Sequence, residues 1–389
     1  MTYNFDEIIT RKGSGCVKHD ALMKFFGHDD LLPMWVADMD FRTPDFIVNA
    51  IRQRCEHEVF GYAIAQESYW DTIMQWLRRH YNIASRQEEL HFIPGIVAGI
   101  AFVMQAMTQA DDHILVTTPV YPPFINVPQS SRRKIVSSPL KIVDGRFCID
   151  FEDLERQARH CSWMILSNPH NPGGTVWGKE VLAQIADICY RNHVNVISDE
   201  IHADMTLPGH QHVSFSTVSE HAREISITFM APSKTFNMAG LSSSVCYCPN
   251  EELRRRFYGF LDGLEVANGN IFAFVGAEAA FRHGEEWLSQ MLTYLQGNVD
   301  YLRTYLSEQM PQVRPILPEA SYLAWLDFNG YGLTHDDIKN RLITQAHVAL
   351  NDGTDFGGAD FQGCFRLNIG CPRQILHEAL EKIRHSMPQ

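Results

Sequence analysis

The sequence has few of the features that mark membrane, secreted or nucleic-acid-binding proteins. Its longest apolar run, residues 95–107, is too short to span a bilayer, and the N-terminal stretch MTYNFDEIITRKGSG has no apolar core. We therefore expect neither a membrane partner nor a signal peptide. The nine cysteines show no repeating spacing, which is typical of reduced thiols in a cytoplasmic protein. A net charge of −13 without a basic stripe argues against nucleic acid as the ligand.

Metal and dinucleotide signals are also weak. His210 and His212 in PGHQH are spaced like a metal pair, but metal sites need three or four ligands and no third is evident. We expect a solvated loop and no metal. The glycines of GTDFGG, residues 353–358, lack the G-x-G-x-x-G spacing of a dinucleotide site. This segment is either a mobile flap near a substrate or a plain connection.

The sequence does contain an alternation of short apolar runs with longer amphipathic segments. Apolar runs that end in polar, Pro or Gly residues predict buried strands, and residues 179–193 have the apolar spacing of a helix. This alternation predicts an α/β fold in which a mostly parallel sheet is covered on both faces. The predicted strands are residues 113–119, 162–169, 194–200, 225–229 and 243–249.

The pattern changes after about Glu285. A long amphipathic helix, an alternating strand at residues 321–328, a helix at 334–345 and the strand CFRLNIGC predict a smaller α+β domain. The first forty residues are polar and irregular, which predicts an arm that packs on the small domain or on a second subunit. The predicted units are the arm (residues 1–45), a large domain (46–285) and a small C-terminal domain (286–389).

Residues at the strand ends are the candidates for chemistry, because ligands of parallel sheets bind outside the carboxyl ends of the strands. Lys234 directly follows the apolar run ISITF, although a lone lysine is seldom buried without a partner. A lysine amine can form a Schiff base with an aldehyde cofactor, which removes its ordinary positive charge. The other candidates at these ends are Tyr121, Asn171, Asp199, His202 and Ser233.

Pyridoxal phosphate (PLP) is an aldehyde cofactor whose ring needs three kinds of protein partner. Asp199 can keep the pyridine nitrogen protonated, so that the ring acts as an electron sink. Asn171 in NPHNPGG can donate to the phenolic oxygen, and Tyr121 in TPVYPPF can stack on the ring. Singly, these features are also typical of a helix cap, a turn and a core aromatic residue. In combination they predict a PLP site.

The cofactor phosphate needs an anion site. The apolar helix that begins after Gly95 offers the backbone amides of residues such as Ile96 and Val97, aided by the helix dipole. Ser233, beside Lys234, adds a hydroxyl group for the same phosphate.

The order Y…NPxNPxG…SDEIH…SKTFN resembles the PLP-dependent aminotransferase superfamily of fold type I, over the whole chain and including the late element RLNIG. The resemblance implies that Lys234 carries the cofactor, that Asp199 pairs with the pyridine nitrogen, and that Asn171 and Tyr121 contact the ring. It also implies that Arg366 grips the substrate α-carboxylate, a task that suits its planar fork.

Further motifs resemble one branch, the MalY/PatB family of cystathionine β-lyases. They are LLPMWVADMDF, VFGYA and APSKTFNMAGL, together with His202 where related aminotransferases usually carry a tyrosine. The resemblance implies a homodimer with shared active sites. In that arrangement Trp35, Val36 and Ala37 line the substrate site, and Tyr62 reaches the cofactor phosphate of the neighbouring subunit.

One position departs from the superfamily pattern. Many members carry a phosphate-binding serine three residues before the lysine, where this chain has Ala231. The phosphate is then expected to depend more on Ser233, on the loop at Gly95 and on Tyr62.

The implied activity is carbon–sulfur β-elimination, in which L-cystathionine or a related cysteine S-conjugate gives homocysteine or another thiol, pyruvate and ammonia. Lys234 serves as the general base. Two alternatives stay open at this point. An aminotransferase uses the same residues but needs a keto-acid partner, and a regulatory relative binds a transcription factor through a surface patch.

Overall fold

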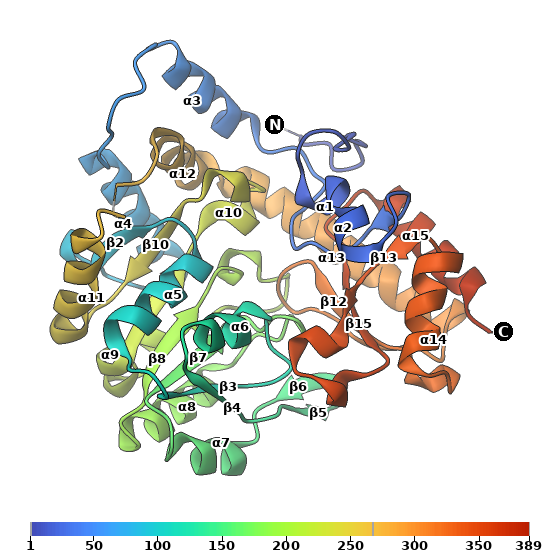
Figure 1. The fold of residues 1–389 in the computed structure, drawn as a ribbon. Helices are drawn as coiled ribbons and strands as arrows, with labels where there is room; N and C mark the ends of the chain where they lie inside the picture. Colours follow the sequence, from blue (N-terminus) through green and yellow to red (C-terminus); the bar gives the residue numbers. More distant parts are fainter. Residues whose placement is uncertain (1, 267, 389) are drawn as a thin grey trace.

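The computed structural model describes residues 2–266 and 268–388, and a seven-stranded sheet forms its centre (Figure 1). Neighbouring strands are parallel except at one strand, β10, which is antiparallel to both of its neighbours. The predicted α/β fold with a mostly parallel sheet is therefore confirmed. In spatial order the strands are β2 (Leu90–Ile93), β10 (Ser244–Tyr247), β9 (Ser226–Met230), β8 (Asn195–Asp199), β7 (Trp163–Ser167), β3 (His113–Val116) and β4 (Lys134–Ser137).

Helices cover both faces of this sheet, as Figure 1 shows. Ile114 and Val116 of β3 belong to the cluster on one face, whereas Leu115 between them belongs to the cluster on the other. Burial on both faces explains why the strands are continuous apolar runs instead of alternating ones. The first face packs on α5 (Ile96–Met107), α6 (Pro123–Ser130) and α11 (Glu251–Gly263), and the second on α7 (Phe151–Ala158), α8 (Lys179–Arg191) and α9 (Glu220–Ile225).

The reversed direction of β10 is a feature that the apolar pattern does not predict. All four residues of β10 are buried, as they are in the parallel strands. Because a strand buried on both faces has the same pattern in either direction, its direction follows from its pairing partners and not from its own sequence.

A second, four-stranded sheet is antiparallel throughout and lies beside the first (Figure 1). The helix predicted at residues 334–345 is α14 (His335–Asn340), continued by one π-helical turn. The predicted domain boundaries at residues 45 and 285 stay a prediction. In spatial order the strands are β11 (Arg314–Ile316), β12 (Leu323–Asp327), β15 (Cys364–Asn368) and β14 (Asn351–Asp352); α13 (Glu285–Gln309) precedes this sheet and α15 (Arg373–Ser386) follows it.

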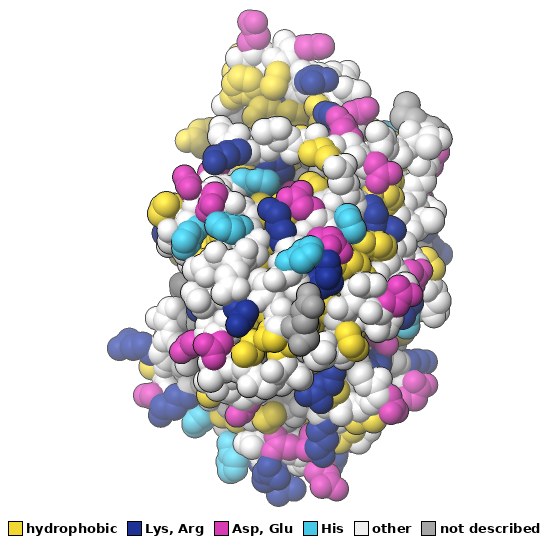
Figure 2. Space-filling model, turned by 90° about the vertical axis from the view of Figure 1, so that its right-hand side faces the viewer, with side chains coloured by type: hydrophobic (Ala, Val, Ile, Leu, Met, Phe, Trp, Pro, Cys, Tyr) yellow, Lys and Arg dark blue, Asp and Glu magenta, His cyan; other side chains and the backbone are white. Residues whose placement is uncertain are grey.

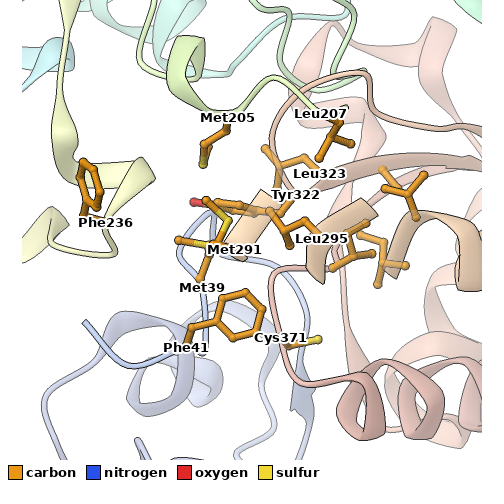
Figure 3. Packing of buried hydrophobic residues seen from close by; sticks show 14 of the residues in the cluster. Met39, Phe41, Met205, Leu207, Phe236, Met291, Leu295, Tyr322, Leu323 and Cys371 are labelled. Atoms are coloured by element: carbon orange, nitrogen blue, oxygen red, sulfur yellow. The ribbon is translucent and has the colours of Figure 1, made fainter. Parts of the chain in front are cut away.

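One hydrophobic cluster links the two sheets and the N-terminal segment (Figure 3). Burial of a single large side chain such as Leu295 or Leu323 contributes about 1.5–3 kcal/mol, so this cluster holds the loops of the first sheet firmly against the second. Figure 3 labels members from each part, among them Met39 and Phe41, Met205 and Leu207, Phe236, Met291 and Leu295, and Tyr322 and Leu323.

The first forty residues are more regular than their polar composition indicates. They form the short helices α1 (Val17–Asp20) and α2 (Leu22–Phe26), and β1 (Leu32–Pro33) pairs with β13 (Val348–Ala349). Lys18 is fully buried, with Nζ 2.7 Å from a carboxylate oxygen of Asp40. Outside these short elements the segment is irregular, as expected. The burial of Lys18 was not predictable from composition, because charged groups can be buried when they are paired and composition does not reveal the pairing.

On the face shown in Figure 2, basic and acidic side chains are interspersed, and hydrophobic side chains gather at the upper end. At that height Figure 1 shows α3 (Asp45–Cys55) and the segment that follows it. Within the described residues, no helix combines the length and apolarity needed to cross a bilayer. The remaining elements are α4 (Glu67–Tyr81), α10 (Pro232–Thr235), α12 (Ile271–His283) and the hairpin of β5 (Lys141–Val143) and β6 (Arg146–Cys148).

Candidate active site

The loops that follow β2, β3, β7, β8 and β9 meet around one cavity of about 250 Å³. This is the carboxyl edge of the parallel strands, where ligands are expected. The N-terminal segment contributes Ala37 to the same cavity. The sequence-predicted residues that line it are Ala37, Ile96, Val97, Tyr121, Asn171, Asp199, His202, Ser233 and Lys234.

Asp199 ends β8 with its carboxyl group buried at the cavity wall. Within the described chain, its one hydrogen-bond donor is the backbone N–H of Ile201, 3.0 Å from Oδ1. Burial raises the pKa of Asp199 to about 7, although the Ile201 N–H and the charge of Lys234 act to lower it. The carboxyl group therefore needs a cationic donor, which a protonated pyridine nitrogen can supply.

Lys234 lies in α10, and its side chain reaches the N-terminal segment. Its Nζ donates to the Ala37 carbonyl oxygen at 2.6 Å. Burial lowers the pKa of Lys234; Asp38 and Asp199 act to raise it, and Arg366 adds to the lowering. A lowered pKa keeps more of the amine in its neutral, nucleophilic form near neutral pH. The surroundings of this amine therefore suit Schiff-base chemistry.

Arg366 lies in β15 of the second sheet, where it is buried and is connected to the cavity wall through Asn171. Its Nη1 donates to Asn171 Oδ1 at 3.0 Å, and its Nη2 donates to the Trp35 carbonyl at 3.0 Å and to Asn351 Oδ1 at 2.6 Å. Burial lowers the pKa of Arg366 to about 10. None of these acceptors is a carboxylate, and no carboxylate of the described residues pairs with Arg366. A buried guanidinium with only neutral acceptors is suited to binding an anion such as a carboxylate.

His202 and Tyr121 are both neutral in this setting. Burial, together with the charges of Lys234 and Arg366, lowers the pKa of His202 to about 3. Its Nδ1 is buried without a hydrogen-bond partner in the described chain, so it is free to bond a ligand. Burial also raises the pKa of Tyr121, which keeps its ring uncharged.

One end of the cavity is built to bind an anion. Gly95, with φ 134°, begins α5, and the free backbone amides of the first turn of α5 lie at the cavity. Ser233 lines the same cavity, together with a run of three further hydroxyl residues. Within that run the buried Ser243 hydroxyl lies beside the Tyr69 hydroxyl. A hydroxyl group can make more than one hydrogen bond, so Ser243 also suits a phosphate group.

Sequence analysis did not identify this hydroxyl run, which comprises Ser242, Ser243 and Ser244. The available signal was the stretch AGLSSS, which follows the lysine in a chain that lacks the usual serine at position 231. Hydroxyl groups gathered after a glycine are common in turns, so the stretch was not distinctive without the fold.

Besides Arg366, three sequence-predicted residues are not among those that line the cavity. Tyr62 is fully exposed and borders a different surface hollow with Tyr69 and Ile271. Trp35 meets Arg366 only through its backbone carbonyl, while its indole N–H donates to the carbonyl of Lys18. Val36 likewise contributes a carbonyl, which accepts from Asn368 Nδ2 at 2.6 Å.

The loop that carries His210 and His212 corrects one expectation. His210 is exposed, but His212 is buried, and its Nε2 lies 3.0 Å from Glu200 Oε2. The loop was expected to be solvated because its neighbours are polar. The carboxylate that permits burial of His212 comes from another segment, the end of β8.

The glycine-rich segment at residues 353–358 packs beside the site. The N–H of Val120 donates to the Phe356 carbonyl at 2.8 Å, and the Arg366 guanidinium lies 5.0 Å from the Phe356 ring centre. These contacts favour the packed connection over the mobile flap.

Comparison with known proteins shows which family and which relatives this chain resembles. Residues 31–383 match the family "Aminotransferase class I and II". Cystathionine beta-lyase PatB of Bacillus subtilis is 38% identical over 99% of this chain and 100% of its own. Protein MalY of Escherichia coli is 30% identical over 97% of each chain. The PLP-bound C–S lyase of Staphylococcus hominis superposes with a TM-score of 0.93 at 33% identity, over 100% of this chain and 99% of its own.

Proposed function

This chain belongs to the aminotransferase class I and II family and, within it, to the MalY/PatB group, and we propose that it is a PLP-dependent carbon–sulfur β-lyase. The proposed reaction is α,β-elimination of L-cystathionine, and of related cysteine S-conjugates, to homocysteine or another thiol, pyruvate and ammonia. The observation that carries the proposal is that Lys234 and Asp199 line one cavity, whose wall residue Asn171 is hydrogen-bonded to the buried Arg366. The full-length similarity to a cystathionine β-lyase favours elimination over transamination.

The residues present fit PLP. Asp199, which lacks a cationic donor, would pair with the pyridine nitrogen, and Lys234 would hold the aldehyde carbon. The first turn of α5 and the buried Ser243 hydroxyl would hold the phosphate. Tyr121 and Asn171 border the same cavity and would contact the ring and its phenolic oxygen.

Bound PLP supplies an electron sink for negative charge at the substrate α-carbon. Arg366 binds the substrate α-carboxylate with its planar fork, and Asn171 orients that fork through its hydrogen bond to Nη1. Lys234 acts as the general base that removes the α-proton. Its lowered pKa favours this role, because the neutral amine is the form that accepts a proton. Loss of the thiolate from the β-carbon completes the elimination, and water then hydrolyses the released 2-aminoacrylate to pyruvate and ammonia.

We further propose a homodimer whose sites are shared, located in the cytoplasm. Around Tyr62, the side chains of Val59, Phe60 and Ile64 are all exposed, and a stretch of neighbouring apolar side chains on a surface is typical of an interface. The nine cysteines, all among the described residues, are free thiols, which suits a reducing compartment.

The test of the proposed function is a product assay on the purified, PLP-loaded protein with L-cystathionine as the sole substrate. We expect pyruvate and a free thiol in equal amounts over many turnovers, without any added keto acid. A protein that stops after one turnover and resumes only when a keto acid is supplied is an aminotransferase, and that result overturns the proposal.

The shared site has its own test, in which two variants are mixed. Tyr62→Ala removes the side chain offered to the partner, and Lys234→Ala removes the amine. Chains of the two variants, unfolded and refolded together, regain activity if each site uses Tyr62 from one chain and Lys234 from the other. No gain above the separate variants means that Tyr62 does not serve the partner's site.

A further inference from the structure

The backbone of residues 35–39 presents a row of carbonyl oxygens to side chains of the site. Each of these consecutive carbonyls accepts a hydrogen bond from a residue distant in the sequence. The donors are Arg366 to Trp35, Asn368 to Val36 and Asp38, Lys234 and Tyr322 to Ala37, and Asn237 to Met39. The segment is therefore held in place by side chains from distant parts of the chain, two of which, Lys234 and Arg366, belong to the proposed site.

The Ala37 carbonyl differs from its neighbours because one of its two donors is the reactive amine. Lys234 Nζ lies 2.6 Å from this oxygen, and the Tyr322 hydroxyl lies 2.9 Å from it. A carbonyl oxygen has two lone pairs, so it can accept both hydrogen bonds at once. The two donors meet at a single atom on the wall of the cavity.

Tyr322 is held rigidly in that position. It is fully buried at the start of β12, and a Cβ on Gly370 would lie 2.9 Å from its ring. Figure 3 shows its hydroxyl oxygen at the end of the ring that points toward the side of Phe236. Burial raises the pKa of Tyr322 well above its usual value. The hydroxyl therefore stays protonated, and its one proton is committed to Ala37, so Tyr322 does not itself exchange protons with a substrate.

We propose that the Ala37 carbonyl is the docking point of the free Lys234 amine, and that Tyr322 is a positioning residue that holds this carbonyl in place. The inference rests on the proposed role of Lys234 as the general base. A docked neutral amine donates one N–H to Ala37 and keeps its nitrogen lone pair free. That lone pair takes the α-proton of the substrate, and the amine becomes an ammonium group. When the amine is engaged elsewhere, Tyr322 keeps the carbonyl hydrogen-bonded.

The first test uses the cofactor-free protein and the variant Tyr322→Phe, which removes only the hydroxyl. Tyr258→Phe is a matched control, because the buried Tyr258 hydroxyl also donates to a backbone carbonyl, that of Glu89, outside the cavity. Reductive methylation of Lys234 at fixed pH is followed by mass spectrometry. We expect labelling about two- to tenfold faster in Tyr322→Phe, the effect of weakening one hydrogen bond, and unchanged in the control.

The second test measures proton transfer in the PLP-loaded protein, separately from carbon–sulfur cleavage. L-Alanine has no leaving group, so the exchange of its α-proton for solvent deuterium, followed by proton NMR, reports on the base alone. In Tyr322→Phe we expect this exchange and kcat to fall about tenfold or more. The Kd for PLP and the KM for L-cystathionine should stay within about twofold. If exchange, kcat, PLP affinity and the KM for L-cystathionine all worsen by the same factor, Tyr322 has a merely structural role and the proposal is overturned. The proposal is also overturned if neither the labelling rate nor the exchange rate changes in Tyr322→Phe.

A third measurement does not depend on the folding of the phenylalanine variant. 3-Fluorotyrosine at position 322 keeps the ring and the hydroxyl, and its fluorine NMR signal reports on the hydrogen bond. Addition of PLP should shift this signal, because Lys234 leaves Ala37, whereas fluorotyrosine at position 258 should not respond. A fluorine chemical shift at position 322 that does not change on addition of PLP contradicts the proposal that the free Lys234 amine binds the Ala37 carbonyl. The labelling test does not require lyase activity, so failure of the proposed function and failure of the dock are distinguishable.

Discussion

Two adjacent carboxylates at the end of β8 differ sharply in how the fold treats them. Glu200 is fully surrounded by donors, whereas Asp199, the residue before it, receives a single backbone N–H at 3.0 Å. The donors to Glu200 are the hydroxyls of Ser198 at 2.9 Å and Ser214 at 3.1 Å, the N–H of Phe215 at 2.9 Å, and His212 Nε2 at 3.0 Å.

This difference separates a structural group from a functional one. Buried polar groups in proteins are normally satisfied, and Glu200 follows that rule. Asp199 does not, and its pKa is raised to about 7 by burial. A buried carboxyl group that lacks a cationic partner costs stability unless a ligand supplies one. Asp199 faces the cavity and Glu200 faces the protein, so only Asp199 is placed to receive that ligand.

The largest expected effect comes from removal of the Lys234 amine, which lines the same cavity as Asp199. Lys234→Ala removes the group that would hold PLP covalently and act as the base, so we expect loss of the visible absorbance of bound PLP. Turnover should fall about a thousandfold or more. Absorbance spectra and the pyruvate assay check both, and substantial turnover in this variant contradicts the assigned role.

The two carboxylates should then respond differently to matched amide substitutions. Asp199→Asn cannot keep a pyridine nitrogen protonated, so kcat should fall about 100- to 1000-fold while the chain stays folded and still binds some PLP. In Glu200→Gln the folded protein should keep kcat within about threefold, since Glu200 does not face the cavity. Steady-state kinetics on both variants measure kcat. A wild-type kcat in Asp199→Asn would mean that Asp199 has no role in the mechanism.

Stability should show the opposite order. Glu200→Gln replaces a carboxylate that only accepts hydrogen bonds with an amide that places an NH₂ group against existing donors. We expect a loss of about 2–4 kcal/mol in the free energy of unfolding, measured by urea denaturation of the cofactor-free protein. A loss below about 0.5 kcal/mol would show that the network contributes little.

The smallest effect is a pH-dependent one in the cofactor-free protein. Because the pKa of Asp199 is raised from 3.8 to about 7 on folding, its ionisation disfavours the folded state. The protonated Asp199 carboxyl group contributes fully to the free energy of unfolding below pH 3.8, and this contribution is lost as the pH rises to about 7. Asp199→Asn should therefore be more stable than the wild type above pH 7, by on the order of 1–2 kcal/mol after relaxation. Near pH 4 the two should match.

Urea denaturation at several pH values measures this difference. PLP should reverse its sign, because the bound pyridinium supplies the missing partner to the wild-type carboxylate. A difference that does not vary between pH 4 and pH 8 would mean that Asp199 does not titrate in this range.

Much of the fold and of the candidate site was predictable because both depend on short local patterns. Apolar runs that end in polar residues located β7, β8 and β9, and the strand-end rule then brought Asn171, Asp199 and Lys234 to one edge. Patterns of this kind indicate where a strand lies and which residue types follow it, and both depend only on a few neighbouring residues.

The features that escaped prediction all depend on partners from elsewhere in the chain. His212 was expected in a solvated loop and Lys18 lies in a segment read as polar and irregular, yet each is buried against a carboxylate, Glu200 or Asp40. The direction of β10 depends on its neighbours β2 and β9. Ser243 becomes distinctive only because the fold places its buried hydroxyl at the cavity.

The sequence by itself determined the kind of chemistry that this protein can perform, since a lysine, an aspartate and an arginine in fixed motifs specify which groups are available. Only the tertiary structure decided how each group is tuned. Folding decides whether a carboxylate has several donors, as Glu200 does, or a single one, as Asp199 does. It also brings the Lys234 amine and the Tyr322 hydroxyl to the Ala37 carbonyl, from which they are 197 and 285 residues away in the sequence. Hydrogen bonds and burial act through space, so they appear only when the chain has folded.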